Sequence, residues 1–443
     1  MFRDRECREK LYYPGHAHGF LCAPARSGKF TCTLAYMLGD FAGSCLVIDP
    51  KGQACAVTAR YRKRRLGQKV YRIDPFNLMP SLPGVKWCPP LAQFDPMATL
   101  NPKSRTFAAD ADNLAEACLP YSQMTEPHWT DGGRMLVSGV AMTLKARWPK
   151  ETLVTLYRVI SGRDLFLFAE EACQWATGNT GGGQFITERL ARYAAQGASE
   201  NKETLCMVSA AATALQFIGN ACIAESLSGS TLNFEAMKRE KITCYLILPG
   251  EYLGGNCMKW FRLVAASFTG AMMREPSRRV PVLGIFDEYK SAVGKVGVIE
   301  AAMGLGAGYG FQLVPVLQDL NQLRELHPEG WETFLANSGF RIFFAPRDKT
   351  TSDYVSDMAG DMEVRGVSKS VAEDRRTKET QVNISFAQHG RRYLLPYETR
   401  NLGDGEALIF GENIPGVIRC GRLPYYRSKE FRFDPDPYEF GRR

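Results

Sequence analysis

Two segments that lie far apart in this sequence contain residue types that together can carry out phosphate chemistry. The first is Ala23-Pro24-Ala25-Arg26-Ser27-Gly28-Lys29, a loop between an apolar run and a helical pattern. A Gly-Lys loop in this position directs backbone N–H groups and an ammonium toward polyphosphate. The second is the apolar run 283–286, which ends in Asp287 and Glu288. Because such carboxylates hold Mg²⁺ and activate water, the two segments predict a nucleotide hydrolase.

This chemistry gives each side chain an expected role. Lys29 is expected to hold the β- and γ-phosphates, with the amides of Ser27, Gly28 and Lys29 around them. Asp287 is expected to order Mg²⁺ through water, and Glu288 to act as general base on the attacking water. The other residues expected at the nucleotide are Ala25, Arg26, Phe30, Thr31 and Asp49.

The loop departs from the usual phosphate-binding pattern at two positions. Ala23 stands where glycine is usual, and Phe30 stands where a serine or threonine usually follows the lysine. The missing hydroxyl is normally a ligand of Mg²⁺, so Thr31 or a water must replace it, or metal binding is weak. In isolation the loop is equally compatible with a surface turn. For the run ending in Asp287, a solvent-facing strand end is the alternative, but the apolar residues before it favour a central strand that ends at a ligand site. The flanking strand and helix patterns favour the nucleotide site.

Polar residues end two further strand-like runs. Gln318 follows the run 313–317, and its amide is a candidate sensor of the γ-phosphate, although a hydrogen-bonded strand end explains it equally well. The segment Asp49-Pro50-Lys51-Gly52 is most simply a turn at a strand end. Its position relative to the other segments also makes it a candidate second wall of the nucleotide-binding crevice. Ligands of α/β sheets bind at the carboxyl ends of strands, so both segments are candidate site residues.

The densest cluster of positive charge lies between Asp49 and Asp74. A solvated helix face is the favoured interpretation, and contact with nucleic-acid phosphates is the alternative, which would make binding salt-dependent. Tyr61 and Tyr71 lie in the same stretch but do not establish base stacking. The basic residues are Arg60, Arg62, Lys63, Arg64, Arg65, Lys69 and Arg72.

The elements that must position these residues belong to an interrupted α/β domain. Short apolar runs alternate with helical or polar stretches over residues 20–104, as in a parallel sheet. Helical spacing then dominates to about residue 230, and strand-like runs return after it. The expected strands are 20–22, 45–49, 69–74, 243–248, 283–287, 313–317, 341–344 and 407–410.

We therefore predict a nucleotide-binding domain in two parts, 1–104 and 231–443, with an all-α domain inserted at 105–230. Residues 177–183, rich in glycine, are expected to form a flexible loop within the insertion. The apolar faces of its helices are expected at two sets of positions: Leu136, Val137, Val140 and Leu144, and Leu205, Val208, Ala212 and Leu215.

Bulk composition limits the class of protein. A length of 443 residues predicts two or three domains, and 45% apolar with 23% charged residues is ordinary for a soluble protein. The net charge of +8 permits a nucleic-acid partner without requiring one. The 13 scattered cysteines indicate buried thiols in a reducing cytosol. We expect no transmembrane segment, because no run of about 18 apolar residues occurs.

These segments together resemble the coupling proteins of type IV secretion, the TraG/TraD-like group of conjugative ATPases. The loop 23–29 is similar to that group's variant phosphate-binding loop, and 47–52 to its Asp-x-Lys-Gly strand end. The resemblance covers about residues 12 to 430 and follows the family's order. The remaining similar segments are 286–289, 308–310, 318–323, 337–346, 350–352 and 408–410.

The resemblance implies a RecA-like domain that binds ATP and Mg²⁺, interrupted by an all-α domain that engages the cargo. It implies a hexameric ring that moves relaxase-bound single-stranded DNA, or hands over secreted protein, at a type IV secretion channel. The expected location is the cytoplasmic side of the bacterial inner membrane, as a peripheral protein.

Some relatives carry an arginine at the position of Ala307 that reaches a neighbour's nucleotide, so turnover is expected to be slow. Arg341 and Arg347 are suggested substitutes. Two rival hypotheses remain: a scaffold that binds substrates without hydrolysis, which Phe30 and Ala307 favour, and a DNA translocase of the FtsK and HerA group.

Overall fold

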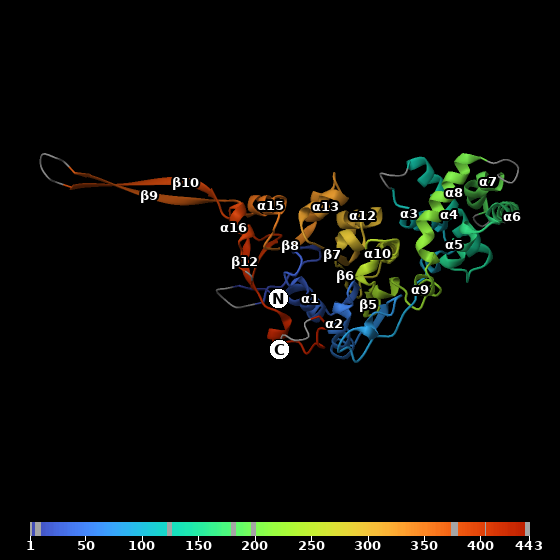
Figure 1. The fold of residues 1–443 in the computed structure, drawn as a ribbon, viewed down its shortest axis with the longest axis horizontal. Helices are drawn as coiled ribbons and strands as arrows, with labels where there is room; N and C mark the ends of the chain where they lie inside the picture. Colours follow the sequence, from blue (N-terminus) through green and yellow to red (C-terminus); the bar gives the residue numbers. More distant parts are fainter. Residues whose placement is uncertain are drawn as a thin grey trace.

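A mixed sheet of ten strands forms the centre of the computed structural model, which describes residues 2–4, 10–121, 126–178, 183–195, 201–373, 380–403 and 405–438 (Figure 1). The strand order is β1-β12-β11-β8-β2-β7-β6-β3-β5-β4. The strands are β1 (Phe2–Asp4), β2 (His18–Cys22), β3 (Ser44–Ile48), β4 (Lys69–Ile73), β5 (Ile242–Leu246), β6 (Val282–Phe286), β7 (Phe311–Leu317), β8 (Ser338–Phe344), β11 (Glu406–Gly411) and β12 (Ile418–Arg422).

The strands from β8 to β4 in this order are parallel to one another. Every residue of β2, β3, β5 and β6 is buried. Strands covered on both faces read as continuous apolar runs, which is why the sequence predicted them within a few residues. Their carboxyl ends meet at one edge of the sheet. At the other side, β11 and β12 continue the sheet in antiparallel fashion.

Helices cover both faces of the sheet. The cores on the two faces take alternate residues of each strand: Leu46 packs in the core that contains α10, and Val47 packs in the core that contains α1 and α2. The helices are α1 (Ala35–Asp40), α2 (Gln53–Arg65), α3 (Phe107–Cys118), α4 (Pro127–Arg147), α5 (Leu153–Ser161), α6 (Leu165–Thr177), α7 (Gly183–Ala194), α8 (Lys202–Leu215), α9 (Ala221–Ser226), α10 (Met258–Arg274), α11 (Tyr289–Ala292), α12 (Gly297–Leu305), α13 (Leu320–Leu326), α14 (Trp331–Ala336), α15 (Lys349–Ala359) and α16 (Pro396–Arg400).

Helices α3 to α9 lie between β4 and β5 in the chain, and α3 to α8 gather at one end of the molecule in Figure 1. Leu136, Val137, Val140 and Leu144 of α4 are buried, as predicted. The predicted face of α8 is partly correct: Leu215 is buried and Val208 and Ala212 pack against the core, but Leu205 is 44% exposed and the buried Met207 was not predicted. Helix α8 packs against α4, which determines its inner face. Residues 179–182 of the predicted flexible loop lie outside the described residues.

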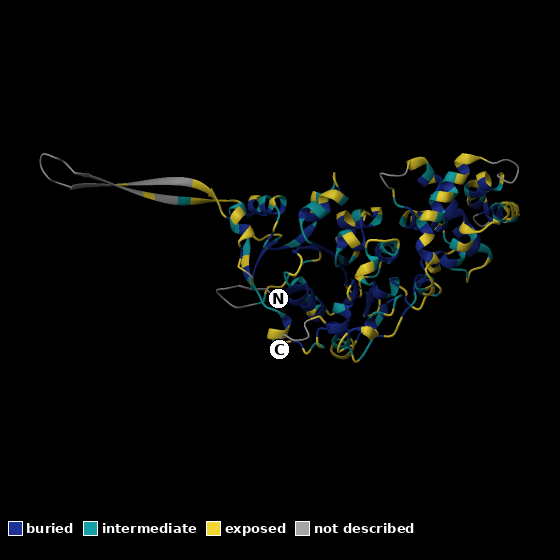
Figure 2. Ribbon diagram, viewed as in Figure 1, coloured by how far each residue is buried: buried dark blue, intermediate teal, exposed yellow. Residues whose placement is uncertain are grey.

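A two-stranded hairpin was not predicted. Strands β9 (Asp361–Glu373) and β10 (Thr380–Arg392) pair with each other and project from the end opposite α3 to α8 in Figure 1. Val367 is 62% and Ile384 54% exposed on it. Figure 2 shows that the strands of the central sheet are largely buried between the helical layers.

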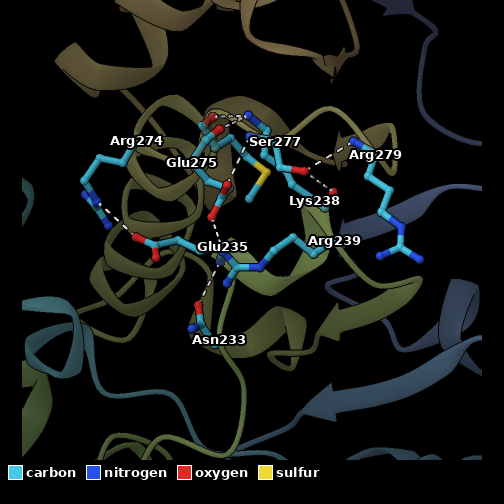
Figure 3. A network of polar contacts seen from close by, with 9 residues as sticks. Asn233, Glu235, Lys238, Arg239, Arg274, Glu275, Ser277 and Arg279 are labelled. Atoms are coloured by element: carbon cyan, nitrogen blue, oxygen red, sulfur yellow. Dashed lines mark hydrogen bonds and ion pairs between the residues drawn. The ribbon is translucent and has the colours of Figure 1, made fainter.

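A polar network fixes the segment that leads into β6 (Figure 3). Lys238 is fully buried, and its ammonium donates to the carbonyls of Met272, at 2.7 Å, and Glu275 at the end of α10. Arg274 pairs with Glu235 at 3.4 Å on the same helix end. These contacts lie at the amino edge of the sheet, opposite Asp287, so we interpret this polar network as structural.

The cysteines in the described part of the chain are all free thiols, and most are buried. Among the described helices, none combines the length and the apolar character needed to cross a membrane.

Candidate nucleotide site

The loop 23–29 lies at the carboxyl edge of the sheet, directly after β2. The Ala23 N–H donates to the Leu317 carbonyl at 2.9 Å, which ties the loop to the end of β7. Arg26 and Gly28 adopt positive φ angles of 60° and 82°. A side chain at position 28 would be strained at this angle, so glycine is required there. The chain then turns into η1 (Phe30–Leu34) and α1.

Several polar groups of the loop fit a phosphate ligand. In the described part of the chain, the N–H groups of Arg26, Gly28 and Lys29 have no protein acceptor. The hydroxyl oxygen of Ser27 is buried and makes no hydrogen bond there. Buried polar groups are normally hydrogen-bonded, so an anion with several oxygens suits this loop. Ala25 and Arg26 are exposed at its outer end.

Lys29 joins the loop to the two predicted carboxylates. Its ammonium lies 2.7 Å from Asp287 Oδ1 and 2.5 Å from Glu288 Oε1, with side-chain exposures of 16% for Lys29 and 22% for each carboxylate. The carboxylates follow β6, and β3 and β7 flank that strand. The structure therefore brings together residues that the sequence separates, because parallel strands end at the same edge.

Burial and charge shift the pKa values of this group in different directions. Burial alone would lower the pKa of Lys29, but the carboxylates beside it raise that pKa above its usual value. Burial raises the pKa of Asp287 despite the nearby ammonium. Burial also acts to raise the pKa of Glu288, but Lys29 and the Gln318 amide outweigh it and hold that pKa below its usual range. Glu288 is thus ionised and able to accept a proton at neutral pH.

Gln318 completes the cluster from the end of β7. Its Nε2 donates to Glu288 Oε2 at 3.0 Å, so the amide contacts the predicted base directly. Glu288 itself has φ 53° and ψ 47°, in the left-handed region. That conformation costs roughly 1–2 kcal/mol for a residue with a side chain. Backbone strain of this kind is concentrated at functional sites.

Asp49 lies at the end of β3 and is 4% exposed. Its Oδ2 accepts from the Cys55 N–H at 2.8 Å, at the amino end of α2. Burial raises the pKa of Asp49 to about 7. The N–H groups of Cys55, Ala54 and Gln53 act to lower this pKa, and the nearby Asp287 carboxylate acts to raise it. Asp49 therefore belongs to the same electrostatic cluster, although its carboxylate is directed to the helix.

The two residues after Lys29 have different surroundings. Phe30 is 7% exposed, and its ring lies 6.1 Å from that of Tyr425, so the side chain belongs to the core. The Thr31 hydroxyl donates to the Gly28 carbonyl at 3.2 Å, beside the loop. No cluster of three or more His, Cys, Asp or Glu side chains in the described chain could hold a metal by itself. The donors present, Asp287 and Thr31, suit Mg²⁺ that is also bound by phosphate and water.

The structure says less about the arginines suggested as substitutes at a neighbour's nucleotide. Arg341 lies within β8, where it pairs with Phe20 and Phe410, and Arg347 is exposed after that strand. Ala307 lies in η8 (Gly306–Tyr309), and its side chain is outside the described part of the structure.

The basic cluster of residues 60–72 divides into structural and solvent-exposed members. Arg62 is fully buried and donates to Thr243 Oγ1 at 2.8 Å and to the Gly43 carbonyl at 2.9 Å. Arg72 is buried and donates to Asn77 Oδ1 at 2.9 Å. Arg60 pairs with Asp434 at 3.1 Å. The predicted solvated helix face describes the exposed Lys63, Arg64 and Arg65 of α2 and is wrong for the buried Arg62 and Arg72, and contact of the exposed residues with nucleic-acid phosphates stays a prediction.

A separate cleft of about 1010 Å³ lies between the inserted helices and the α/β part. Its lining includes Glu116 of α3, Arg262 of α10 and Glu300 of α12, and it includes no residue of the loop 23–29. The nucleotide site rests on convergent side chains at the sheet edge, not on this cleft.

Sequence reasoning missed two residues that contact the site. Arg422 donates to the Ser27 carbonyl, and the Tyr438 hydroxyl donates to the Lys51 carbonyl at 2.6 Å. No local pattern marks either residue, because both contacts join opposite ends of the chain.

Comparison with known proteins agrees with the resemblance. Protein VirD4 of Agrobacterium fabrum is 24% identical over 428 residues, which cover 94% of this chain and 59% of that protein. The chain therefore spans about three fifths of the VirD4 relative. Conjugal transfer protein TraG of Escherichia coli is 23% identical over 450 residues, covering 94% of this chain and 68% of TraG.

The fold matches solved structures across its length. The bacterial conjugative coupling protein TrwBΔN70 has a TM-score of 0.65 at 15% identity, covering 94% of this chain and 87% of that one. This likeness confirms the RecA-like α/β fold with an all-α insertion. The family described as "Type IV secretory system Conjugative DNA transfer" matches residues 3–440. The chain therefore belongs to the type IV secretory system conjugative DNA transfer family.

Proposed function

We propose that this chain is an ATP-dependent coupling protein that brings substrates to a type IV secretion channel in conjugation. The proposed ATPase activity rests on one observation: Lys29, Asp287, Glu288 and Gln318 converge at the edge of the sheet where ligands of such sheets bind. Structures of TrwB in complex with ADP and Mg²⁺, and with a non-hydrolysable ATP analogue, support ATP and Mg²⁺ as its ligands.

In this proposal the contacts of Lys29 change when nucleotide binds. The ammonium leaves Asp287 and Glu288 for the β- and γ-phosphates, which the N–H groups of the loop surround. Loss of the ammonium raises the pKa of Glu288, which strengthens it as the base that takes a proton from water. Asp287, through water, and Thr31 would hold Mg²⁺, which would supply charge neutralisation at the phosphates when bound. Gln318, already on Glu288, reports the state of the γ-phosphate.

The partners follow from the family. The all-α domain, residues 105–230, would engage relaxase-bound single-stranded DNA or a secreted protein, and residues 1–104 and 231–443 would form the motor. We propose a homo-hexamer that docks peripherally at the bacterial inner membrane and contacts the secretion channel.

The decisive experiment measures ATP binding and ATP hydrolysis with and without single-stranded DNA. Lys29→Ala is the test variant. Lys290→Ala is the matched control, because Lys290 pairs with Glu325 on the surface. We expect DNA-stimulated turnover that Lys29→Ala abolishes and Lys290→Ala retains.

One alternative is a scaffold that binds nucleotide without hydrolysis. The packing of Phe30 into the core favours it, since no hydroxyl occupies the usual Mg²⁺ position. Nucleotide binding without turnover under every condition would establish this alternative. A translocase of the FtsK and HerA group would hydrolyse ATP with DNA but would not bind a relaxase or a channel component, so a pull-down with those partners separates the two motors.

A further inference from the structure

The last part of the described chain runs over helices α1 and α2 and contacts both loops of the candidate site. We call residues 422–438 the C-terminal strap. It starts at the end of β12, continues through η9 (Tyr425–Arg427) and ends beside Lys51.

The first anchor of the strap is Arg422. Its Nη1 donates to the Ser27 carbonyl, and its guanidinium lies 4.2 Å from the ring centroid of Phe344. In a trans peptide unit the C=O and the following N–H point in opposite directions. A guanidinium on the Ser27 carbonyl therefore directs the Gly28 N–H away from Arg422. That N–H is one of the groups without a protein acceptor in the described loop.

The second anchor is Tyr438, whose hydroxyl donates to the Lys51 carbonyl at 2.6 Å. The N–H of the same peptide unit, at Gly52, donates to the Asp49 carbonyl at 3.0 Å. The unit is thus held at both ends. This fixes the turn that carries Asp49 to the amino end of α2.

Between the anchors the strap rests on the helices that leave the two loops. Phe431 and Phe433 stack with ring centroids 4.9 Å apart. Phe431 packs on Tyr36 of α1 at 5.5 Å, and both rings pack on Tyr61 of α2. Asp436 Oδ2 accepts from Gln53 Nε2 at 2.7 Å at the start of α2. These contacts make the strap a continuous connection rather than two isolated hydrogen bonds.

We propose that the strap positions the nucleotide loops, with Arg422 setting the direction of the Gly28 N–H and Tyr438 fixing the Asp49 turn. Both are positioning residues, because they act through the backbone and not on the phosphates themselves. The nucleotide part of this inference rests on the proposed function, but the effect on the loop does not.

The test uses the full chain and two readouts. Hydrogen–deuterium exchange of residues 23–34 without nucleotide reports the order of the loop. Titration with Mg²⁺ and a fluorescent ADP analogue, together with KM and kcat for ATP, reports its function. Arg422→Ala is compared with Arg427→Ala, an exposed arginine on the same segment, and with Arg422→Lys as the conservative rescue. Tyr438→Phe removes only the hydroxyl.

We expect faster loop exchange in Arg422→Ala but not in Arg427→Ala, with equal thermal midpoints for the two variants. We expect the Kd for the analogue and the KM for ATP to rise about tenfold while kcat changes less than twofold, since a charge-assisted hydrogen bond is lost. Lysine at 422 is expected to recover part of this loss, and Tyr438→Phe to raise the KM about threefold.

Unchanged exchange and affinity in Arg422→Ala would overturn the inference. Equal changes in both arginine variants would also overturn it, because the effect would then be one of general charge. If the wild-type protein fails to bind the analogue while Arg422→Ala still loosens the loop, the proposed function fails and the role of the strap in holding the loop stands.

Discussion

Replacing Lys29 by methionine is expected to expose how the nucleotide-free site is stabilised. The substitution keeps an unbranched chain of similar size but leaves Asp287 and Glu288 without the ammonium that lies 2.7 and 2.5 Å from them. Removing one partner of a buried ion pair costs about 3–5 kcal/mol. The exposures of 16% and 22% allow some hydration, so we expect a loss of about 2–3 kcal/mol.

The loss must depend on pH in a defined direction. Burial already raises the pKa of Asp287, and removal of Lys29 raises that pKa further. A carboxyl whose pKa is higher in the folded state binds its proton more tightly there, so stability falls as pH rises above its unfolded pKa of about 4. The destabilisation by Lys29→Met is therefore larger at pH 8 than at pH 5.

The assay is urea unfolding without nucleotide at both pH values. Lys290→Met is the matched control, since its ion pair with Glu325 has exposures of 35% and 64% and is expected to contribute about 0–1 kcal/mol. The triple variant Lys29→Met, Asp287→Asn, Glu288→Gln should recover most of the loss, because no charge is then buried. Equal losses at pH 5 and pH 8, or a loss no larger than that of the control, would refute the reasoning.

Three further outcomes are expected in unfolding experiments. Arg62→Met should cost about 3–5 kcal/mol, because the partners of a buried guanidinium lose their donors, whereas exposed Arg64→Met should stay within about 0.5 kcal/mol. Asp49→Asn should stabilise the nucleotide-free protein relative to wild type more at pH 8 than at pH 5, by a difference on the order of 1–3 kcal/mol, because a carboxyl with a folded pKa of about 7 loses stability as pH rises from its unfolded pKa of about 4 to 7, and asparagine does not titrate; an equal gain at both pH values would contradict this. Met207→Ala should cost about 2–4 kcal/mol and Leu205→Ala less than about 1 kcal/mol, and the reverse order would restore the face first predicted for α8.

Two arginines show most clearly what the local sequence pattern determines and what packing determines. Arg62 and Arg64 are two residues apart in one basic run, and the sequence offers no way to distinguish them. Only the position of Arg62 against Thr243, brought close by the pairing of β3 with β5, makes one a core residue and the other a surface residue. The hairpin β9–β10 was missed for a related reason: its strands pair only with each other, so burial by helices did not impose the continuous apolar pattern that marked the sheet.

The sequence by itself determined the strand-loop-helix around Lys29, the buried strand ending in Asp287 and Glu288, the all-helical character of the insertion and the family. These features follow from local patterns. Because parallel strands end at a common edge, the sequence pattern also implied that Lys29, Glu288 and Gln318 converge. Only the tertiary structure decided that Lys29 rests on the carboxylates, that α8 buries Met207, and that Arg422 holds the Ser27 carbonyl 395 residues away. Such contacts depend on the relative placement of distant elements, which leaves no periodic trace in the chain.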